Sequence, residues 1–502
     1  MRWFDAPRPA KACGKTMMWR ILGPRARLGG LARRIFRSRL RGGQPLRQRM
    51  LGALFCSFLL TVLLISVSPV SLLAQETPTV RTPPPQQIEP PTNTPAPAAA
   101  DETQSYTLSH ERYEKAVAYS RAGYILYFLS VLIGFAVLLA ALRFGMVGRI
   151  RDLAQRTSEN RLVQGLLFIP LLVIFLDLVE LPVHIAWHAL SLHYEQSVQH
   201  WGSWFLDWCK AELIVLAFLT LMGLILFFII RKSPQRWWFY FWLATLPIIL
   251  AVSILEPVII DPLFFKFEPL AAQYPALTTD LQKLTQRAGL QIPRERMYVM
   301  NASVKTNQLN AYVIGFGASK RVVIFDTLLQ KMAPQETLFI FGHESGHYVL
   351  NHVRDGFFFA TVLLLVALYV CYRLLHILLQ RVGSSWKVYG AQDWAALAVL
   401  LLILQGIMFF SSPIINGFSR MQEHNADVFG LELIHGIVPN SSQVAAHSFQ
   451  ALGEIDLADP NPPPFITFWM YSHPPLAERL VFAHSYDPWG KHQPPRYIKD
   501  QR

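Results

Sequence analysis

Charged residues are scarce in this chain of 502 residues. Asp, Glu, Lys and Arg make up 16% of it, whereas soluble domains carry about 25% charged residues. Hydrophobic residues make up 52%, and many of them stand in long runs. This combination excludes an ordinary soluble protein and indicates an integral membrane protein.

Acidic residues and cysteines are few as well. There are 33 Asp and Glu against 46 Lys and Arg, which gives a net charge of +13. Much of the excess is arginine within residues 1–50, so it forms no nucleic-acid-binding face and no nucleic acid partner is expected. The four cysteines have no C-x-x-C spacing, which indicates packing residues and not a disulfide framework or zinc ligands. They are Cys13, Cys56, Cys209 and Cys371.

Three segments precede the main hydrophobic part of the chain. Residues 1–50 predict a basic N-terminal tail, unless translation starts later, at Met17, Met18 or Met50. Residues 51–74 are apolar and predict either a signal peptide or a first transmembrane segment, since the run is just long enough to span a bilayer. Residues 75–104 are rich in proline and threonine and predict a linker without a core.

Six further apolar runs lie within residues 105–260 and 357–415. Each has close to the twenty or so residues that cross a bilayer. With Leu51–Leu73 they make about seven candidate spans, so the expected fold is mainly α, a polytopic bundle of membrane helices. The six runs are Gly123–Leu142, Gly165–Leu190, Ala211–Ile230, Trp237–Ile260, Phe357–Leu379 and Trp394–Ser412.

The second of these runs contains ionisable residues. Asp177, Glu180 and His184 are spaced i, i+3 and i+7, so they share one face of a helix. Charges inside a membrane are costly and face a cavity or a charged partner. Two interpretations stay open: a water-filled chamber inside the bundle, or a buried pair with an arginine of another helix.

Basic residues alternate between the loops. The first loop holds five arginines and the third holds Arg231, Lys232 and Arg236, whereas the second loop, Ser191–Cys209, holds no lysine or arginine. The positive-inside rule therefore places the first and third loops in the cytoplasm. Residues 261–356 are then expected on the exoplasmic (periplasmic) side.

Residues 261–356 have the composition of a soluble domain. Pro275–Ala288 predicts a helix, and Met297–Val304 and Tyr312–Phe325 predict strands because they are rich in β-branched and aromatic residues. The second strand is interrupted at Gly315-Phe-Gly317, which is typical of a bulge or turn. A strand edge in this domain would suit the addition of an extended peptide.

The same segment contains the motif H-E-x-x-H, formed by His343, Glu344 and His347. On a helix the two histidines lie on one face and can bind one Zn²⁺, with the glutamate beside it to handle protons. A polar helix face without metal is the alternative. Apolar residues flank the motif on both sides, however, and burying these three side chains among them is costly without a metal.

Catalytic zinc has three protein ligands, so one ligand is missing from the motif. It is expected in the second part of the domain, residues 416–502, where Glu423 and Asp427 lie at i and i+4. Glu423 would complete a His₂Glu site, and Asp427 would hydrogen-bond a ligand histidine. His424 points about a quarter turn away and ranks lower. An ordinary amphipathic helix that pairs with Arg420 is the alternative.

Several stretches together resemble the type-1 CAAX prenyl endopeptidase family (Ste-type) of integral-membrane zinc metalloproteases. The resemblance covers roughly Gly123 to Leu480, and the first hundred or so residues lie outside the family pattern. The stretches are Glu256–Lys266, Asn310–Tyr312 with Gly315, the H-E-x-x-H helix, Ser419–Asp427 and Ser472–Leu480.

The resemblance implies seven transmembrane helices around a chamber, capped by a gluzincin-type zinc domain with a small β element and one Zn²⁺ per chain. It implies Glu344 as the catalytic base and His473 as a second catalytic residue that stabilises the oxyanion. His473 is otherwise only a turn residue before two prolines. Arg479 would pair with a carboxylate near the zinc, and Asn310 and Tyr312 would bind substrate.

The function expected is that of a membrane-embedded zinc metalloendopeptidase that cleaves membrane-associated or lipid-modified (CAAX-like) peptides. One alternative is a stress-type quality-control protease for membrane proteins. An alternative of another class is a transporter or receptor with a structural metal site. The expected partners are a peptide or protein substrate, with or without a lipid, and membrane lipid; the oligomeric state stays open.

Overall fold

The computed structural model describes residues 106–315 and 320–499. Within them six helices are long and apolar enough to cross a bilayer, which confirms six of the expected spans. The seventh candidate, Leu51–Leu73, lies outside the described residues, as do the expected basic tail and linker. The six are α4 (His110–Arg143), α6 (Arg161–His193), α7 (Trp201–Lys232), α8 (Trp237–Leu255, continued by a π-helical turn and a 3-10 turn to Leu263), α13 (His352–Val382) and α14 (Ala396–Ile434).

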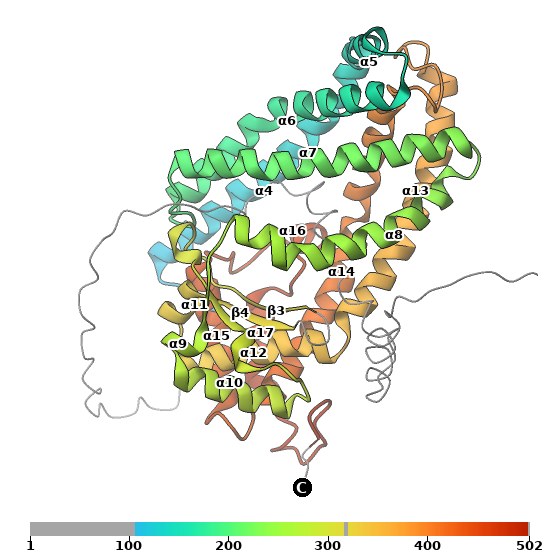
Figure 1. Ribbon diagram of the computed structural model, residues 1–502. Coiled ribbons are helices and arrows are strands. Elements are labelled where there is room, and N and C mark those ends of the chain that lie inside the picture. The colour runs from blue at the N-terminus through green and yellow to red at the C-terminus, as the bar shows by residue number, and fades with distance from the viewer. Residues whose placement is uncertain (1–105, 316–319, 500–502) are drawn as a thin grey trace, which may run out of the picture. The chain divides into compact units, whose positions relative to one another are not determined.

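The six helices contact one another in a closed ring. Helix α4 packs against α6, α6 against α7, α7 against α8, α8 against α13, α13 against α14, and α14 against α4 again (Figure 1). Large apolar side chains such as Leu132, Leu213 and Val362 stay exposed along these helices. Such a surface is unfavourable in water and suits the hydrocarbon of a membrane.

The ionisable face expected on the second span lies at the contact between α6 and α7. Asp177 of α6 shares a hydrogen bond with Glu212 of α7. Within residues 106–315 and 320–499, no arginine forms an ion pair with Asp177 or Glu180. The arginine partner that was one of the two alternatives is therefore absent from the described part of the chain.

The basic loops meet at one end of the ring. The first loop forms a short helix, α5 (Met146–Thr157), which the sequence did not predict. Its Arg151 is buried and donates hydrogen bonds to Asp393 Oδ2 at 2.7 Å and to the Lys387 carbonyl at 2.6 Å, so it joins the first loop to the last. The guanidinium of Arg231, from the third loop, lies 5.0 Å from the ring centre of Trp394.

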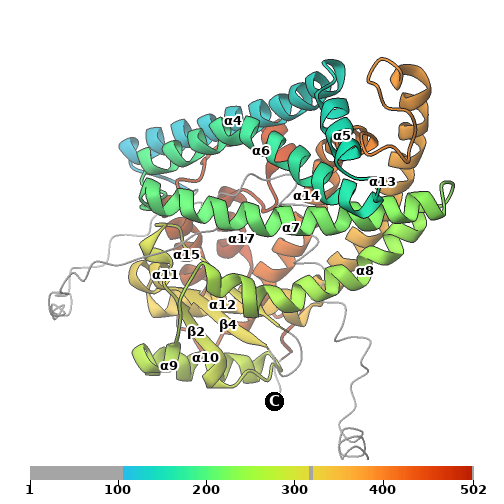
Figure 2. The same ribbon diagram turned by 45° about the horizontal axis from the view of Figure 1, so that its top comes forward.

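The second loop instead contacts the zinc domain. The Val198 amide donates to the Lys305 carbonyl at 2.9 Å. The buried Lys305 ammonium donates to the Phe264 carbonyl at 2.7 Å and lies 3.8 Å from Asp207 of α7. Arg321 pairs with Asp261 at 2.9 Å and adds a second link between the zinc domain and the end of the α8 segment. The zinc domain thus lies at the end that lacks the basic loops (Figure 2).

The zinc domain contains a small sheet, as expected. Its strand order is β1-β2-β4-β3, with β2 and β4 parallel and the other pairs antiparallel. The expected strand Met297–Val304 is wrong beyond Met300, because Ala302–Val304 form a 3-10 turn. The expected strand Tyr312–Phe325 is two strands that pair with each other. The strands are β1 (Phe267–Pro269), β2 (Met297–Met300), β3 (Ala311–Ile314) and β4 (Arg321–Phe325).

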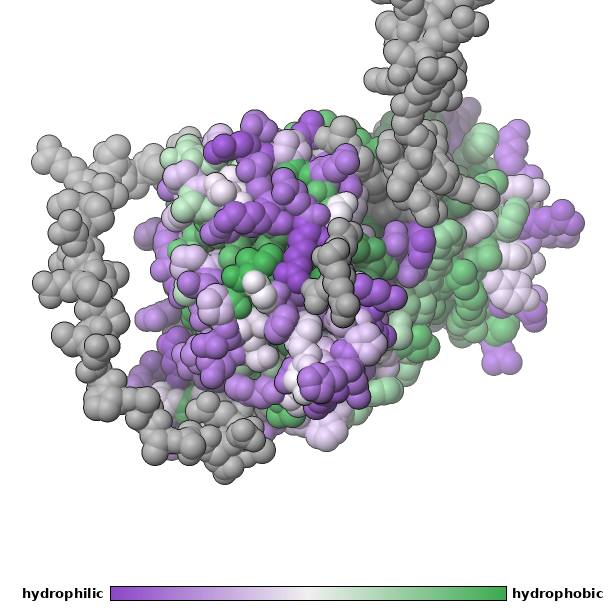
Figure 3. Space-filling model, turned by 90° about the horizontal axis from the view of Figure 1, so that it is seen from below, coloured by the Kyte–Doolittle hydropathy of each residue, from purple (hydrophilic) through white to green (hydrophobic). Residues whose placement is uncertain are grey.

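Helices complete this domain around one apolar core. The helix expected at Pro275–Ala288 is confirmed as α10 (Pro275–Arg287), and its leucines belong to the same core as apolar side chains of the sheet and of α12. The surface seen in Figure 3 is largely hydrophilic over this domain, while hydrophobic surface lies over the helices beside it. The other helices are α9 (Leu270–Gln273), α11 (Asp326–Lys331), α12 (Pro334–Val349), α15 (Ser441–Ile455), α16 (Pro464–Met470) and α17 (Leu476–Ser485).

The last span is longer than the sequence predicted. It was expected to end near Ser412, before a separate helix with the third ligand. Helix α14 instead runs without a break from Ala396 to Ile434, with Pro413 inside it. The residues from Ala426 to Ile434 are all buried, so packing against the zinc domain continues the helix after the apolar run has ended.

Helices α12 and α14 cross at close range because glycines stand at their contact. A Cβ on Gly342 would lie 3.1 Å from the Gly430 carbonyl oxygen, and one on Gly346 would lie 3.0 Å from Phe429 Cβ. A Cβ on Gly430 would lie only 2.8 Å from the backbone nitrogen of His343. The absence of these side chains brings the carboxylates of α14 within reach of the histidines of α12.

We expect Gly430→Ala to lower the free energy of unfolding by about 1–3 kcal/mol, because the added methyl group meets backbone that cannot easily move. Thermal unfolding followed by tryptophan fluorescence in detergent measures the change. Gly417→Ala on the same helix is the control, since its Cβ would meet nothing closer than 3.8 Å. The control should be at least as stable as the wild type, because alanine favours helix. Equal stability of the two variants would contradict the close crossing.

Candidate metal centre and active site

Helix α12 places the H-E-x-x-H motif at the crossing with α14. It begins at Pro334, a favoured first residue of a helix, and Glu336 accepts a hydrogen bond from the Ala333 amide at 2.8 Å. One turn separates His343 from His347, so both rings face α14. His343 is buried and His347 is half-buried.

Three predicted ligands converge at this crossing. The Nε2 atoms of His343 and His347 lie 3.1 Å apart. Glu423 Oε2 is 3.2 Å from His343 Nε2, and Oε1 is 3.5 Å from His347 Nε2. All three ligand atoms lie within 4.8 Å of one another, which confirms the predicted metal site. Two imidazoles and one carboxylate are a donor set that fits Zn²⁺ and leaves a position for water.

A carboxylate and a guanidinium orient the first ligand. His343 Nδ1 lies 2.8 Å from Asp427 Oδ1, and Arg479 contacts the same carboxylate at 2.9 Å (Nε–Oδ2) and 2.5 Å (Nη2–Oδ1). Burial opposes the charged form of His343, but hydrogen bonds and charges of Asp427 and Glu423 outweigh it and raise the pKa of His343 to about 10. Zinc must displace this proton to bind, so its affinity falls as the pH falls.

A third histidine, His352, orients the second ligand. Its Nδ1 lies 3.1 Å from His347 Nδ1, and it is buried at the start of α13. When His347 binds a metal through Nε2, its Nδ1 carries the hydrogen and donates it to His352. The sequence analysis missed this residue. The signal that could have found it is a further histidine five residues after His347, next to the start of an apolar run.

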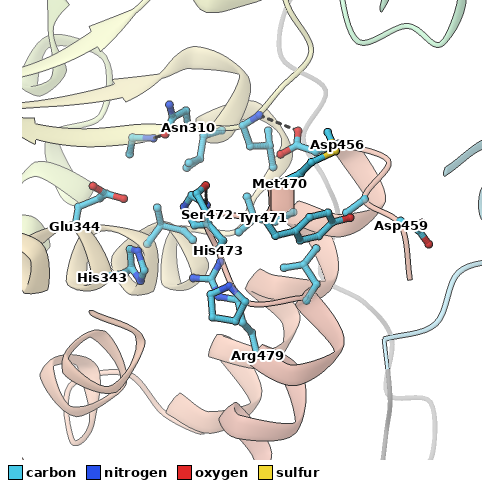
Figure 4. A pocket seen from close by; sticks show the side chains of 18 residues that line it. Asn310, His343, Glu344, Asp456, Asp459, Met470, Tyr471, Ser472, His473 and Arg479 are labelled. Carbon is cyan, nitrogen blue, oxygen red and sulfur yellow. Dashed lines mark hydrogen bonds between the residues drawn. The ribbon is translucent and has the colours of Figure 1, made fainter. Parts of the chain in front are cut away.

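Glu344 faces a cavity beside the metal centre. The cavity has a volume of about 560 Å³, and Glu344, His343 and His473 are among the residues that line it (Figure 4). Burial raises the pKa of Glu344, while the charges of His343 and His347 oppose the rise. Among the described residues no hydrogen bond to its carboxylate is found, so the oxygens can accept one from water.

His473 lies on the side of the cavity towards Glu423. Its Nε2 is 3.3 Å from Glu423 Oε2, and its Nδ1 is 2.9 Å from Ser472 Oγ. The side chain is exposed on the cavity side, and the partial desolvation of its ring lowers the pKa of His473 against the opposing charge of Glu423. The imidazole is therefore neutral near pH 7 and can donate one hydrogen bond into the cavity.

The remaining predicted residues lie at different places. Asn310 is exposed before β3 and lines the cavity, and its Oδ1 accepts from the Ala311 amide at 2.8 Å. Tyr312 does not line the cavity and packs near Met300. His424 packs against the ring of Phe482 and takes no part in the metal centre, in agreement with its lower rank.

Comparisons with known proteins identify the family. The model of "Peptidase family M48" matches residues 271–486, and that of "CAAX prenyl protease N-terminal, five membrane helices" matches residues 92–266. An uncharacterized metalloprotease, YhfN, of Bacillus subtilis (strain 168) is 34% identical over 382 residues, which cover 76% of this chain and 88% of YhfN. The chain belongs to peptidase family M48.

Other M48 relatives carry the name CAAX prenyl protease 1 homolog. That of Dictyostelium discoideum is 31% identical over 277 residues, 54% of this chain and 61% of the relative. That of Homo sapiens is 25% identical over 376 residues, 66% of this chain and 76% of the relative. The crystal structure of S. mikatae Ste24p has the same fold, with a TM-score of 0.65, 22% identity, and coverage of 89% of this chain and 100% of that chain.

Geometry and family together establish the chemistry in outline. The M48 chain is a multi-pass membrane protein and a zinc metalloprotease, a hydrolase of peptide bonds. Its zinc ligands are His343, His347 and Glu423.

We expect Asp427→Asn to weaken zinc binding roughly 10- to 100-fold, because the neutral amide supports His343 less well and leaves Arg479 without its partner. Competition with a chelator of known affinity at fixed pH measures the change. Asp280→Asn, which removes an equal charge from a solvent-exposed ion pair with Lys283, should bind zinc like the wild type. Unchanged zinc affinity in the Asp427 variant would show that the carboxylate does not support the ligand.

Proposed function

We propose that this M48 enzyme is an endopeptidase that cleaves membrane-associated or lipid-modified peptides, with Glu344 as its catalytic base. One observation carries the proposal. The Glu344 carboxylate lines a cavity directly beside three converging zinc ligands, at the end of a domain seated on a ring of membrane helices. CAAX prenyl protease is the name of several relatives and suggests lipid-modified substrates.

The chain's own residues supply proton transfer and charge stabilisation. Zinc, when bound, polarises the scissile carbonyl and lowers the pKa of a coordinated water. Glu344 takes a proton from the attacking water and delivers it to the leaving amine, and burial, which raises its pKa, makes the carboxylate a stronger base. The neutral His473 donates a hydrogen bond to the developing oxyanion. Asp427 and Arg479 hold His343, and His352 holds His347.

The edge of the sheet offers a place for the substrate backbone. Strand β3 is at the edge of the sheet, with β4 on one side only, and it lies next to α12. An extended peptide that pairs with this edge would pass the metal centre, as in other complexes in which a peptide adds to a sheet. Asn310, which precedes the strand and lines the cavity, would bind the peptide backbone. Tyr312 is a weaker candidate because it lies outside the cavity.

A quality-control protease for membrane proteins is the second candidate. The basic loops gather at the end of the ring away from the zinc domain, which supports an exoplasmic zinc domain. A prenylated protein on the cytoplasmic face could not reach a catalytic centre on that side. Exposed segments of misfolded membrane proteins could reach it.

We expect Glu344→Gln to retain zinc and to lower the rate of peptide cleavage roughly 10²- to 10⁴-fold, because the amide cannot accept a proton. Metal analysis and cleavage of fluorogenic peptides, with and without a prenyl group, measure both properties. Glu295→Gln, an exposed residue of the same domain, is the matched control. Retained cleavage would contradict the proposed base. Loss of zinc in the Glu344 variant would show a structural role instead.

Cysteine labelling tests the orientation. In a background without native cysteines, Lys320→Cys in the zinc domain should react with a membrane-impermeant maleimide in intact cells. Ser384→Cys, exposed in the loop between α13 and α14, should react only after permeabilisation. The reverse pattern would place the catalytic centre in the cytoplasm and restore cytoplasmic prenylated proteins as accessible substrates.

A further inference from the structure

We propose that the cavity beside Glu344 is a substrate subsite for a lysine or arginine side chain, and that Asp456 is the residue that selects it. The inference rests on the proposed endopeptidase function and adds a substrate class to it. Three observations support it: the course of the cavity from the metal centre to Asp456, the apolar side chains that line it, and the lack of a cationic partner for the Asp456 carboxyl group.

The cavity runs from the metal centre to Asp456. Glu344 and His343 line one part of it, Ser472 and His473 follow, and Asp456 lies beyond Met470, as the close view shows (Figure 4). Because the cavity opens beside the catalytic residues, a side chain next to the scissile bond can enter it. Its walls are largely apolar, formed by Leu309, Leu328, Ile340, Leu452, Met470 and Leu476.

Asp456 has no cationic partner within bonding distance in the described part of the chain. Its Oδ1 accepts a single hydrogen bond, from the Leu309 amide at 3.3 Å. Burial raises the pKa of Asp456 to about 7, against the lowering effects of that hydrogen bond and of the charge on Lys331. The Lys331 ammonium is turned to Asn307, whose carbonyl and side-chain oxygens it contacts at 2.9 and 3.2 Å.

Two other charged groups of the lining, Arg479 and Asp459, already have partners, and Glu344 stands beside the metal centre as the proposed base. Arg479 contacts both oxygens of Asp427. Asp459 accepts hydrogen bonds from the Tyr124 hydroxyl at 3.2 Å and from the Asn461 amide at 3.0 Å, and its side chain lies at the far margin of the view in Figure 4. Apart from the catalytic Glu344 beside the metal centre, Asp456 is therefore the carboxyl group in this lining that can best accept a hydrogen bond from a substrate.

A long basic side chain matches this combination. The methylene groups of lysine or arginine pack against apolar walls, while the cationic end reaches the carboxylate. An aliphatic side chain would fill the walls but leave the buried carboxyl group without a partner, and an acidic one would be repelled. The cavity thus favours substrates with a basic residue beside the cleaved bond over those with aliphatic residues on both sides of it.

A series of fluorogenic peptides tests the proposal on the wild-type, zinc-loaded enzyme in detergent. The peptides differ only at the residues next to the cleaved bond, where lysine, norleucine, glutamine or glutamate is placed. Lysine is expected to give a kcat/KM roughly 30-fold or more above norleucine, a ratio typical of a buried charge pair. Asp456→Asn should remove this preference while zinc content and the unfolding temperature stay unchanged. Asp280→Asn controls for the loss of one negative charge.

The outcomes separate the two proposals. If the wild-type enzyme cleaves none of the peptides faster than the Glu344→Gln variant does, the proposed endopeptidase function is wrong. If peptides are cleaved but lysine gives no advantage over norleucine, the function stands and the subsite proposal is wrong. If lysine is preferred and Asp456→Asn, folded and zinc-loaded, keeps the preference, another residue selects the basic side chain and the role of Asp456 is overturned.

Discussion

The close crossing of α12 and α14 is the constraint on which the catalytic centre depends. Neither helix contains a complete metal site: α12 supplies two imidazoles, and α14 supplies the carboxylates of Glu423 and Asp427. They meet only because Gly342, Gly346 and Gly430 leave no side chains between the two backbones. The site is therefore a property of helix packing, and the buried charges that it gathers have local partners, with Arg479 against Asp427 and His343 against Glu423.

The same crossing joins the two halves of the molecule. Helix α14 belongs both to the membrane ring and to the zinc domain, so the ligand Glu423 is carried by a membrane helix. Lys305 with Asp207 and Arg321 with Asp261 add polar links between ring and domain. Catalytic chemistry of a kind common in soluble proteases is thereby fixed at the end of a membrane bundle.

Much of this could be predicted from the sequence, because the strongest signals are local. An apolar run as long as a bilayer is thick predicts a membrane helix by its length alone. The H-E-x-x-H motif predicts two metal ligands because its histidines lie on the same face of a helix. Helix α5, strand β1 and the full length of α14 were missed, since each is stabilised by partners distant in sequence, such as Asp393 for Arg151. His352 was missed because its role needs the turn between α12 and α13, which places it against His347.

The unbroken course of α14 gives this enzyme a mechanical property. A helix that spans the bilayer tilts when the hydrocarbon layer becomes thicker or thinner. Because Glu423 lies beyond the apolar part of that helix, one metal ligand belongs to the same continuous helix as a membrane span, with Pro413 inside the helix between the two. The orientation of this helix in the bilayer and the position of a zinc ligand are thus parts of one rigid element.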